Sequence, residues 1–319
     1  MRRSSLPVII SYCSVAIGVG FAISIIIAIF PQWWLFDLFS HFRIQYVLAG
    51  FLLLPVFLWL KKYVVAIVAT LAILIHSYAL WPYLQANVPN MNARAEEHSQ
   101  EGTRILFANI YYKSLDVEAV ENLIKKNNPD VMVFAEVNEE HYQTLVAEIG
   151  KVYPYHDFKN GLGAYDISYF SKKKLEAEAV YFTEDNPSWW LTYQQNGKTM
   201  NILGIHPHSP TSQKTSRERN AHLTAALSFA AKSDDATVIV GDFNISQFSK
   251  IFQDLLEENQ LIDTQLEFGL QPSWHAQVPS LFRIPIDQVV VNDKVKVLDR
   301  YVGEYDGSDH FPVIVSVSM

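Results

Sequence analysis

Eight polar residues stand at or beside the ends of apolar segments that have the composition of buried strands. They are Asn109, Glu136, His206, Asp242, Asn244, Asp287, Asp309 and His310. Binding and catalytic groups are commonly built where strand ends meet at one edge of a sheet. Oxygen ligands in a set without cysteine favour a hard cation such as Mg²⁺ or Mn²⁺ over zinc. The pattern therefore indicates a candidate metal-dependent site.

Each of these residues also has an ordinary structural interpretation when it is taken alone. Asn109 can be a turn former, Glu136 a surface carboxylate before a helix, and Asp242 part of a Gly-Asp-Phe-Asn turn. The histidines can be strand-end residues, and an Asp-His pair can simply cap a strand. The occurrence of the whole set in this order along the chain favours the chemical interpretation.

Short apolar runs alternate with helical patterns from residue 103 onward. Strands are predicted at 104–109, 131–136, 167–171, 179–182, 189–195, 200–206, 237–242, 286–291 and 313–317. Helices are predicted at 117–127, 139–149, 216–232 and 248–258, with Asp116 as an N-cap, and Asn196-Gly197 is a predicted hairpin turn. Val- and Ile-rich strands separated by helices indicate sheets covered by helices.

The first 86 residues have the composition of a membrane anchor. Uncharged runs at about 8–30, 44–60 and 63–84 are long enough to cross a bilayer, with Trp and Tyr near their ends. Two alternatives stay open: the first run can be a cleaved signal peptide, and the middle run, at the short end of the range, can be a buried or re-entrant segment.

Positive charges predict how such an anchor is oriented. Arg2 and Arg3 precede the first run, and Lys61 and Lys62 link the second to the third. Three crossings put both pairs on one side, which the positive-inside rule makes cytoplasmic. We therefore expect a multi-pass protein of the inner or plasma membrane. A polar linker at 87–102 would lead to an extracytoplasmic domain at 103–319.

Charge and cysteine content restrict the remaining possibilities. Of 25 Lys and Arg and 33 Asp and Glu residues, only five basic residues and Asp37 precede residue 94, so the rest carries a net charge of about −12. Such a domain does not attract a long polyanion through general electrostatics. Cys13 is the one cysteine, which excludes an intrachain disulfide and a cysteine-based zinc site.

Several motifs resemble the endonuclease/exonuclease/phosphatase superfamily, which includes DNase I. They are Phe107-Ala108-Asn109, Val133-Phe134-Ala135-Glu136-Val137, Ile205-His206-Pro207, Val240-Gly241-Asp242-Phe243-Asn244, Ile286-Asp287-Gln288-Val289 and Gly307-Ser308-Asp309-His310-Phe311-Pro312-Val313. The combination of Gly-Asp-Phe-Asn with a terminal Ser-Asp-His is specific, and Pro272-Ser273-Trp274 resembles a segment of bacterial membrane-anchored members. The resemblance implies an α+β fold, a two-sheet β-sandwich flanked by helices, here preceded by three transmembrane helices.

The resemblance also implies roles for the polar residues. Glu136 would be the principal ligand of Mg²⁺ or Mn²⁺, helped by Asn109 and Asp309. Asp242 would orient or deprotonate the attacking water, and Asn244 would hold the water or a phosphate oxygen. His310 would contact the scissile phosphate with Asp287 behind its ring, and His206 would be a second phosphate donor.

The sequence departs from this pattern at a few positions. Gln288 replaces a histidine that is common after the Asp, and residues 161–171 match loosely. His208 would point to the opposite face from His206 if the strand continued. Trp274 can stack on a substrate or simply pack.

The resulting expectation is a membrane-anchored enzyme that hydrolyses phosphate esters. Three substrate classes stay open: nucleic acid, a lipid or inositol-phosphate head group, and a small phosphodiester. A non-catalytic anchored binding module is the alternative, although it would have been free to lose some of the polar residues. The lipid bilayer is an expected partner, and no protein partner is implied.

Overall fold

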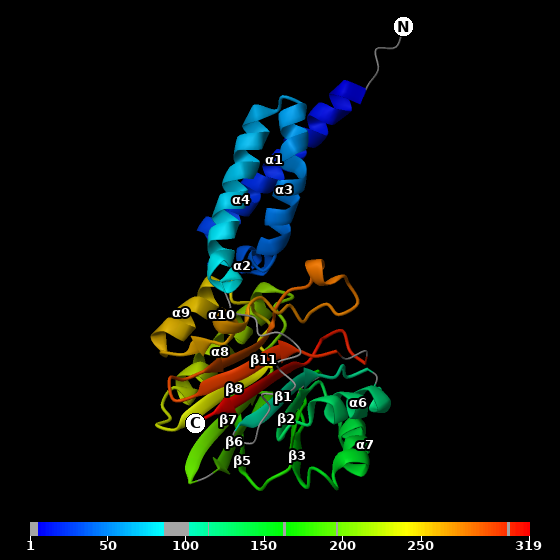
Figure 1. Cartoon of the computed structure of the whole chain (residues 1–319), viewed down its shortest axis with the longest axis vertical. Helices are drawn as coiled ribbons and strands as arrows, with labels where there is room; N and C mark the ends of the chain where they lie inside the picture. Colours follow the sequence, from blue (N-terminus) through cyan, green and yellow to red (C-terminus); the bar gives the residue numbers. More distant parts are fainter. Residues whose placement is uncertain (1–5, 86–101, 114, 162–163, 196, 305–306) are drawn as a thin grey trace.

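The chain forms an upright bundle of apolar helices above a two-sheet domain in the computed structural model (Figure 1). The structure describes all residues except 1–5, 86–101, 114, 162–163, 196 and 305–306. Three predictions fall wholly or partly outside the described residues. They concern the charges of Arg2 and Arg3, the linker at 87–102, and the turn at Asn196-Gly197.

The bundle contains α1 (Leu6–Ile29), α2 (Trp34–Ser40), α3 (Arg43–Trp59) and α4 (Tyr63–Leu84). Among the helices that the structure describes, only α1 and α4 are individually long and apolar enough to span a membrane. The short helix α2, which the sequence did not predict, meets α3 at 65°, and the two reach a spanning length only together. The three predicted crossings therefore become two, or three if the bent pair counts as one.

Two six-stranded sheets form the domain, which confirms the predicted fold class. The first has the order β11-β12-β1-β2-β4-β3 and the second the order β5-β6-β7-β8-β10-β9. The strands of the first sheet are β1 (Thr103–Asn109), β2 (Val131–Ala135), β3 (Tyr155–Lys159), β4 (Ile167–Ser171), β11 (Lys296–Val302) and β12 (Val313–Ser318). Those of the second are β5 (Glu176–Thr183), β6 (Asn186–Gln195), β7 (Lys198–Ile205), β8 (Ala236–Asp242), β9 (Ile262–Asp263) and β10 (Asp287–Val291).

Apolar side chains of both sheets meet in a central core, and helices cover the two outer faces. Phe107, Val133, Trp189 and Val238 are buried in that core. The outer face of the first sheet packs against α6 (Val117–Asn127) and α7 (Glu139–Ile149). The outer face of the second packs against α8 (Gln213–Ala230) and α9 (Lys250–Glu258). As predicted, Asp116 caps α6, because its side chain accepts a hydrogen bond from the backbone N–H of Ala119 at 2.9 Å.

The strand pairing brings the polar strand ends to one edge of the domain. β1 runs parallel to β2, with Asn109 opposite Ala135, and β7 runs parallel to β8. β10 is antiparallel to β8, so that Asp287 lies directly opposite Asp242. Parallel strands end at the same edge of their own sheet. The polar ends of the two sheets also meet each other, since the amide of Asn109 lies 3.4 Å from Oδ2 of Asp242.

Three strands were absent from the sequence prediction. β3 reads Tyr-His-Asp-Phe-Lys and β11 has an irregularity between Val297 and Asp299. Both are edge strands, which keep polar residues and bulges and so lack a clear apolar alternation. β9 has only two residues. Two short helical turns, α10 (Gln265–Phe268) and η1 (Ser280–Phe282), lie in the long connection before β10.

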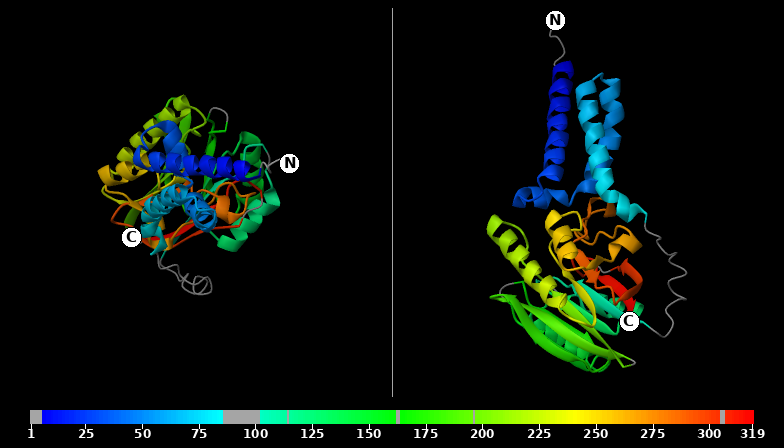
Figure 2. Two further views of the ribbon diagram at one scale, coloured as in Figure 1. Left: turned by 90° about the horizontal axis from the view of Figure 1, so that it is seen from above. Right: turned by 90° about the vertical axis from the view of Figure 1, so that its left-hand side faces the viewer.

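The bundle packs directly onto the domain (Figure 2). Leu80 and Tyr83 of α4 bury Phe248, and the rings of Tyr83 and Phe248 meet edge to face at 5.8 Å. Nδ1 of His41, between α2 and α3, lies 2.7 Å from the hydroxyl of Ser246. The domain is thus docked on the helix bundle through side-chain contacts.

Candidate active site

Asn109 and Glu136 form the half of the site that the first sheet provides. The amide of Asn109, at the end of β1, donates to Oε1 of Glu136 at 2.9 Å. Glu136 follows β2 in a left-handed conformation with φ of 57°, a strained geometry that tends to occur at functional sites. Burial raises the pKa of Glu136, while the hydrogen bond from Asn109 opposes that shift. Glu136 itself stays partly exposed, so the site is open at this point.

Asp242 is the last residue of β8, and Asn244 lies in the sharp turn that follows. The backbone N–H of Asn244 donates to Oδ1 of Asp242 at 2.9 Å, and Asn244 has a φ of 51°. The amide of Asn244 donates to the carbonyl of Pro207 at 3.1 Å. Oδ2 of Asp242 lies 3.4 Å from the Asn109 amide, so the carboxylate joins the two sheets. Burial raises the pKa of Asp242, and His310 opposes that shift.

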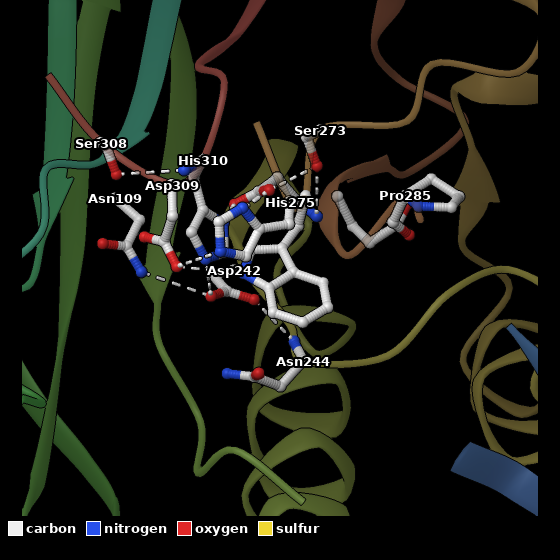
Figure 3. A network of polar contacts seen from close by, with 12 residues as sticks. Asn109, Asp242, Asn244, Ser273, His275, Pro285, Ser308, Asp309 and His310 are labelled. Carbon is white, nitrogen blue, oxygen red and sulfur yellow. Dashed lines mark hydrogen bonds and ion pairs between the residues drawn. The ribbon is translucent and has the colours of Figure 1, made fainter. Parts of the chain in front are cut away.

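His310 contacts two carboxylates, those of Asp287 and Asp242, and Figure 3 shows its side chain beside Asp242. Its Nδ1 lies 3.0 Å and 3.2 Å from the two oxygens of Asp287, and its Nε2 lies 3.6 Å from Oδ2 of Asp242. Burial lowers the pKa of His310, but Asp287 and Asp242 outweigh it and raise the pKa overall. The pairing of His310 with Asp287, expected from the resemblance, is therefore present.

The pair forms between the two sheets. Asp287 begins β10 in the second sheet, whereas His310 precedes β12 in the first, and β11 lies between them in the sequence. They meet because the two sheets face each other, not because their strands are neighbours. Ser273, whose hydroxyl donates to Oδ2 of Asp287, supports the carboxylate from the adjoining loop.

Asp309 faces the loop that contains Trp274. The indole N–H of Trp274 donates to Oδ2 of Asp309 at 3.2 Å, and Nε2 of His275 lies 4.0 Å from the same oxygen. The Trp274 ring centre is 6.3 Å from that of His310. Trp274 thus packs at the border of the site, and its stacking on a substrate stays a prediction.

His206 is buried against Asp242. Its Nε2 lies 3.7 Å from Oδ2 of Asp242, and neither ring nitrogen has a hydrogen-bond partner among the described residues. Burial, with a further contribution from His310, lowers the pKa of His206 to about 3, so the imidazole is neutral near pH 7. β7 ends at Ile205, so His208 does not continue the strand, and the Tyr165 ring contacts both histidines at 5.3 and 4.4 Å.

Comparison with known proteins identifies the family. A profile of the endonuclease/exonuclease/phosphatase family matches residues 106–310. The chain belongs to this family. Among curated proteins, no sequence matches it significantly.

Solved structures share the fold of this family member at low sequence identity. A humanised D. rerio TDP2 is 15% identical over 69% of this chain and 100% of its own length, with a TM-score of 0.57. The human Nocturnin catalytic domain with bound sulfate is 16% identical over 68% and 94%, with a TM-score of 0.55. A Leptotrichia buccalis family protein is 16% identical over 68% and 100%, with a TM-score of 0.56. At this identity the similarity establishes the fold.

The site of this family member has the donors that a metal ion requires. Asp242, Asp287 and His310 each offer one ligand atom, and these atoms lie within 4.8 Å of one another. The set predicted from the resemblance was Glu136, Asn109 and Asp309, of which the first two are hydrogen bonded to each other. Carboxylates thus gather from both sheets, and a bound cation would offset their mutual repulsion. The carboxylates and the imidazole of Asp242, Asp287 and His310 are ligand types that fit a divalent cation.

Two supporting residues were missed from the sequence as parts of the site. Ser273 lies in the Pro272-Ser273-Trp274 motif, but only the folded loop shows its bond to Asp287. Arg219 of α8 is fully buried and donates to the backbone carbonyl of Asn244 at 2.9 Å. Gln288 lies behind the site, where its amide donates to the carbonyl of Pro285 at 2.7 Å and its carbonyl accepts from Gln265 at 2.8 Å.

Proposed function

We propose that this chain is a membrane-anchored hydrolase of phosphate esters that works with a divalent cation, Mg²⁺ or Mn²⁺. The observation that carries this proposal is the contact between the Asp287–His310 pair and Asp242 at the edge where Asn109 holds Glu136. Acid–base groups and cation ligands thereby share one site within the matched region of a phosphoesterase family.

Glu136, with Asn109 and Asp309, would hold the cation. Asp287 and His310 are less suited to that role because each already satisfies the other, and Ser273 occupies Asp287 further. When bound, the cation would withdraw charge from a phosphoryl oxygen and neutralise the surrounding carboxylates.

Asp242 would orient the attacking water and take its proton. Because burial raises its pKa, this carboxylate is a stronger base than an exposed one. Asn244 fixes Asp242 through its backbone N–H and would hold the water or a phosphate oxygen. The water oxygen forms a bond to phosphorus, the P–O bond to the leaving alcohol breaks, and the alcohol oxygen takes up a proton.

His310 and His206 would donate to phosphoryl oxygens as negative charge develops on them. Asp287 holds Nδ1 of His310, which leaves Nε2 directed toward the site and favours the charged imidazolium. His206 is neutral and has an N–H to offer on one of its two unpartnered nitrogens. Both rings are buried, so their hydrogen bonds are stronger than they would be in water.

A substrate panel tests the proposal. The full chain in detergent would be given single-stranded and duplex DNA, phospholipids, inositol phosphates and small phosphodiesters, with Mg²⁺, with Mn²⁺ and with EDTA. We expect cation-dependent hydrolysis that Glu136→Gln lowers by at least about a hundredfold. Glu140→Gln, an exposed change on α7, is the matched control and should leave the rate unchanged. No hydrolysis of any ester by the folded chain would refute the proposal.

We also propose that residues 1–86 anchor the chain and that the catalytic domain, at 103–319, lies outside the cytoplasm. α3 begins and α4 ends at the domain, so Lys61 and Lys62 in their link lie at the far end of the bundle (Figure 1). The positive-inside rule makes that end cytoplasmic. Alkaline phosphatase fused to the C-terminus should be active and a fluorescent protein dark, and the reverse would contradict the orientation.

A further inference from the structure

A loop beside the site exposes apolar side chains at the foot of the helix bundle. Leu281 and Phe282 of η1 are 48% and 58% exposed. The amide of Gln45, in the first turn of α3, donates to the carbonyl of Leu281 at 2.9 Å. Figure 1 shows this orange turn beside the foot of α3. The helix α2, also at the foot of the bundle, exposes Leu35 and Phe39. Apolar residues thus surround the end of helices that have the composition of membrane spans.

The other end of the same loop borders the active site. Trp274 donates to Asp309, and the backbone N–H of Ala276 donates to the Asp309 carbonyl at 2.7 Å. Arg283 braces the loop, because its guanidinium donates to the carbonyls of Val278 and Ala276 at 2.8 and 3.1 Å. One braced segment therefore joins the site to the apolar turn.

The site has a fixed position relative to the anchor. Arg219 donates both to Asp37 of α2, at 2.6 Å, and to the carbonyl of Asn244, at 2.9 Å. Ser246, four residues after Asp242, contacts His41 of the anchor. Four residues reach at most about 14 Å, so Asp242 stays close to the foot of the bundle. The docked domain holds its site near the surface from which the helices emerge.

We propose that Leu281 and Phe282 enter the bilayer surface, and that the site takes the phosphate ester of a membrane lipid. This inference rests on the proposed function and names its substrate class. The head group of a membrane lipid would lie close to the site, so its binding needs no long-range electrostatic attraction. A long nucleic acid would have to approach residues 94–319, which carry a net charge of about −12. Apolar side chains beside membrane spans favour the bilayer as the occupant of this surface.

The reaction consumes only lipid and water. Water adds to phosphorus and one P–O ester bond of the phosphodiester breaks. The products are a phosphomonoester and an alcohol, and the alcohol oxygen receives a proton. Neither an oxidant nor a second co-substrate is needed.

The test compares one enzyme on two kinds of substrate. The full chain would be reconstituted into vesicles of phosphatidylcholine, phosphatidylethanolamine and phosphatidylglycerol with Mg²⁺, and lipid products followed by mass spectrometry. Bis(p-nitrophenyl) phosphate, a soluble diester, and single-stranded DNA would be assayed in the same vesicles. Leu281→Ser/Phe282→Ser removes the apolar turn. Val152→Ser/Tyr181→Ser, exposed residues outside the bundle contacts, is the matched control.

We expect wild-type enzyme and control to hydrolyse a vesicle lipid. The loop variant should lose about tenfold or more of that rate but keep its rate on the soluble diester, since each side chain contributes membrane affinity by apolar burial. Cation-dependent hydrolysis of the soluble diester or DNA without lipid hydrolysis would overturn the inference and leave the proposed function intact. An unchanged lipid rate in the loop variant would also overturn it. Hydrolysis of none of the substrates would refute both.

Discussion

Asp37 and Arg219 form an ion pair that is buried where the helix bundle meets the domain. Their side chains are 1% and 0% exposed, and they lie 2.6 Å apart. Ser249 donates to the other oxygen of Asp37, while Arg219 also supports the carbonyl of Asn244. Asp37→Asn keeps the size of the side chain and removes its charge, so that Arg219 is left buried without a counter-charge.

The expected loss of stability follows from that burial. Removing one partner of a buried ion pair costs about 3–5 kcal/mol, because the remaining charge stays desolvated. For a domain of this size, each kcal/mol changes the Tm by about 2–4 °C, so Asp37→Asn should lower it by roughly 6–20 °C. Asp37→Leu with Arg219→Met removes both charges and should recover much of the loss. The double variant should still turn over more slowly, because Asn244 loses its support.

The assay is thermal unfolding of the wild type, Asp37→Asn, Asp37→Leu, Arg219→Met and Asp37→Leu/Arg219→Met in the same detergent. Turnover of a soluble diester is then measured below the lowest Tm. A large coupling between the two positions is expected from the double-mutant cycle. A change of less than about 2 °C in Asp37→Asn would show that the pair does not hold the anchor and domain together. The fixed position of the site would then lose its basis.

Three further predictions concern the pH dependence of stability, the cation and nucleic acid. Burial lowers the pKa of His222 to about 3. Below about pH 6.5 the imidazole of His222 therefore takes up a proton in the unfolded chain but not in the folded one, and the free energy of unfolding falls as the pH falls. At pH 5 the loss is about 2 kcal/mol, and urea unfolding at pH 7.5 and 5 should show a weaker pH dependence in His222→Gln. Glu136→Gln should weaken Mg²⁺ binding in calorimetry without lowering the Tm, and unchanged affinity would place the cation elsewhere. Binding of long DNA should be weak and lost with added salt, whereas tight binding at physiological salt would favour a nuclease.

Much of the domain was predictable because its elements have strong local signals. The bounds of α6 and α7 agree with their apolar periodicity, and β4 agrees with its apolar run. The edge strands β3 and β11 were missed because an edge strand has a neighbouring strand on one side only. Its residues therefore stay more exposed and need not be apolar. The helix α2 was missed because seven residues are too few to show a period, and its packing depends on distant segments such as α8, where Arg219 donates to Asp37.

The polar residues of the site were predictable as a set, whereas their mutual contacts were not. Each stands at a strand end, which the sequence displays directly. The bond between His310 and Asp287 depends on how two sheets pack face to face, which local patterns do not encode. The support of Asn244 by Arg219 joins positions 25 residues apart, and the pair with Asp37 spans 182 residues. Such long-range contacts required the folded chain.

The central claim is that the site around His310 is the phosphoesterase centre. Its most direct test measures the rate of phosphodiester hydrolysis and the Tm of His310→Ala, Asp287→Asn and the double variant. His310 touches both Asp287 and Asp242, so removing its ring should lower the rate by at least about a hundredfold. Asp287→Asn should lose much of the activity as well. The double variant should be little worse than His310→Ala, because residues that act as a unit are not additive. We expect these losses with little change in Tm. Near-normal turnover by folded His310→Ala would contradict the assignment of this site as the phosphoesterase centre.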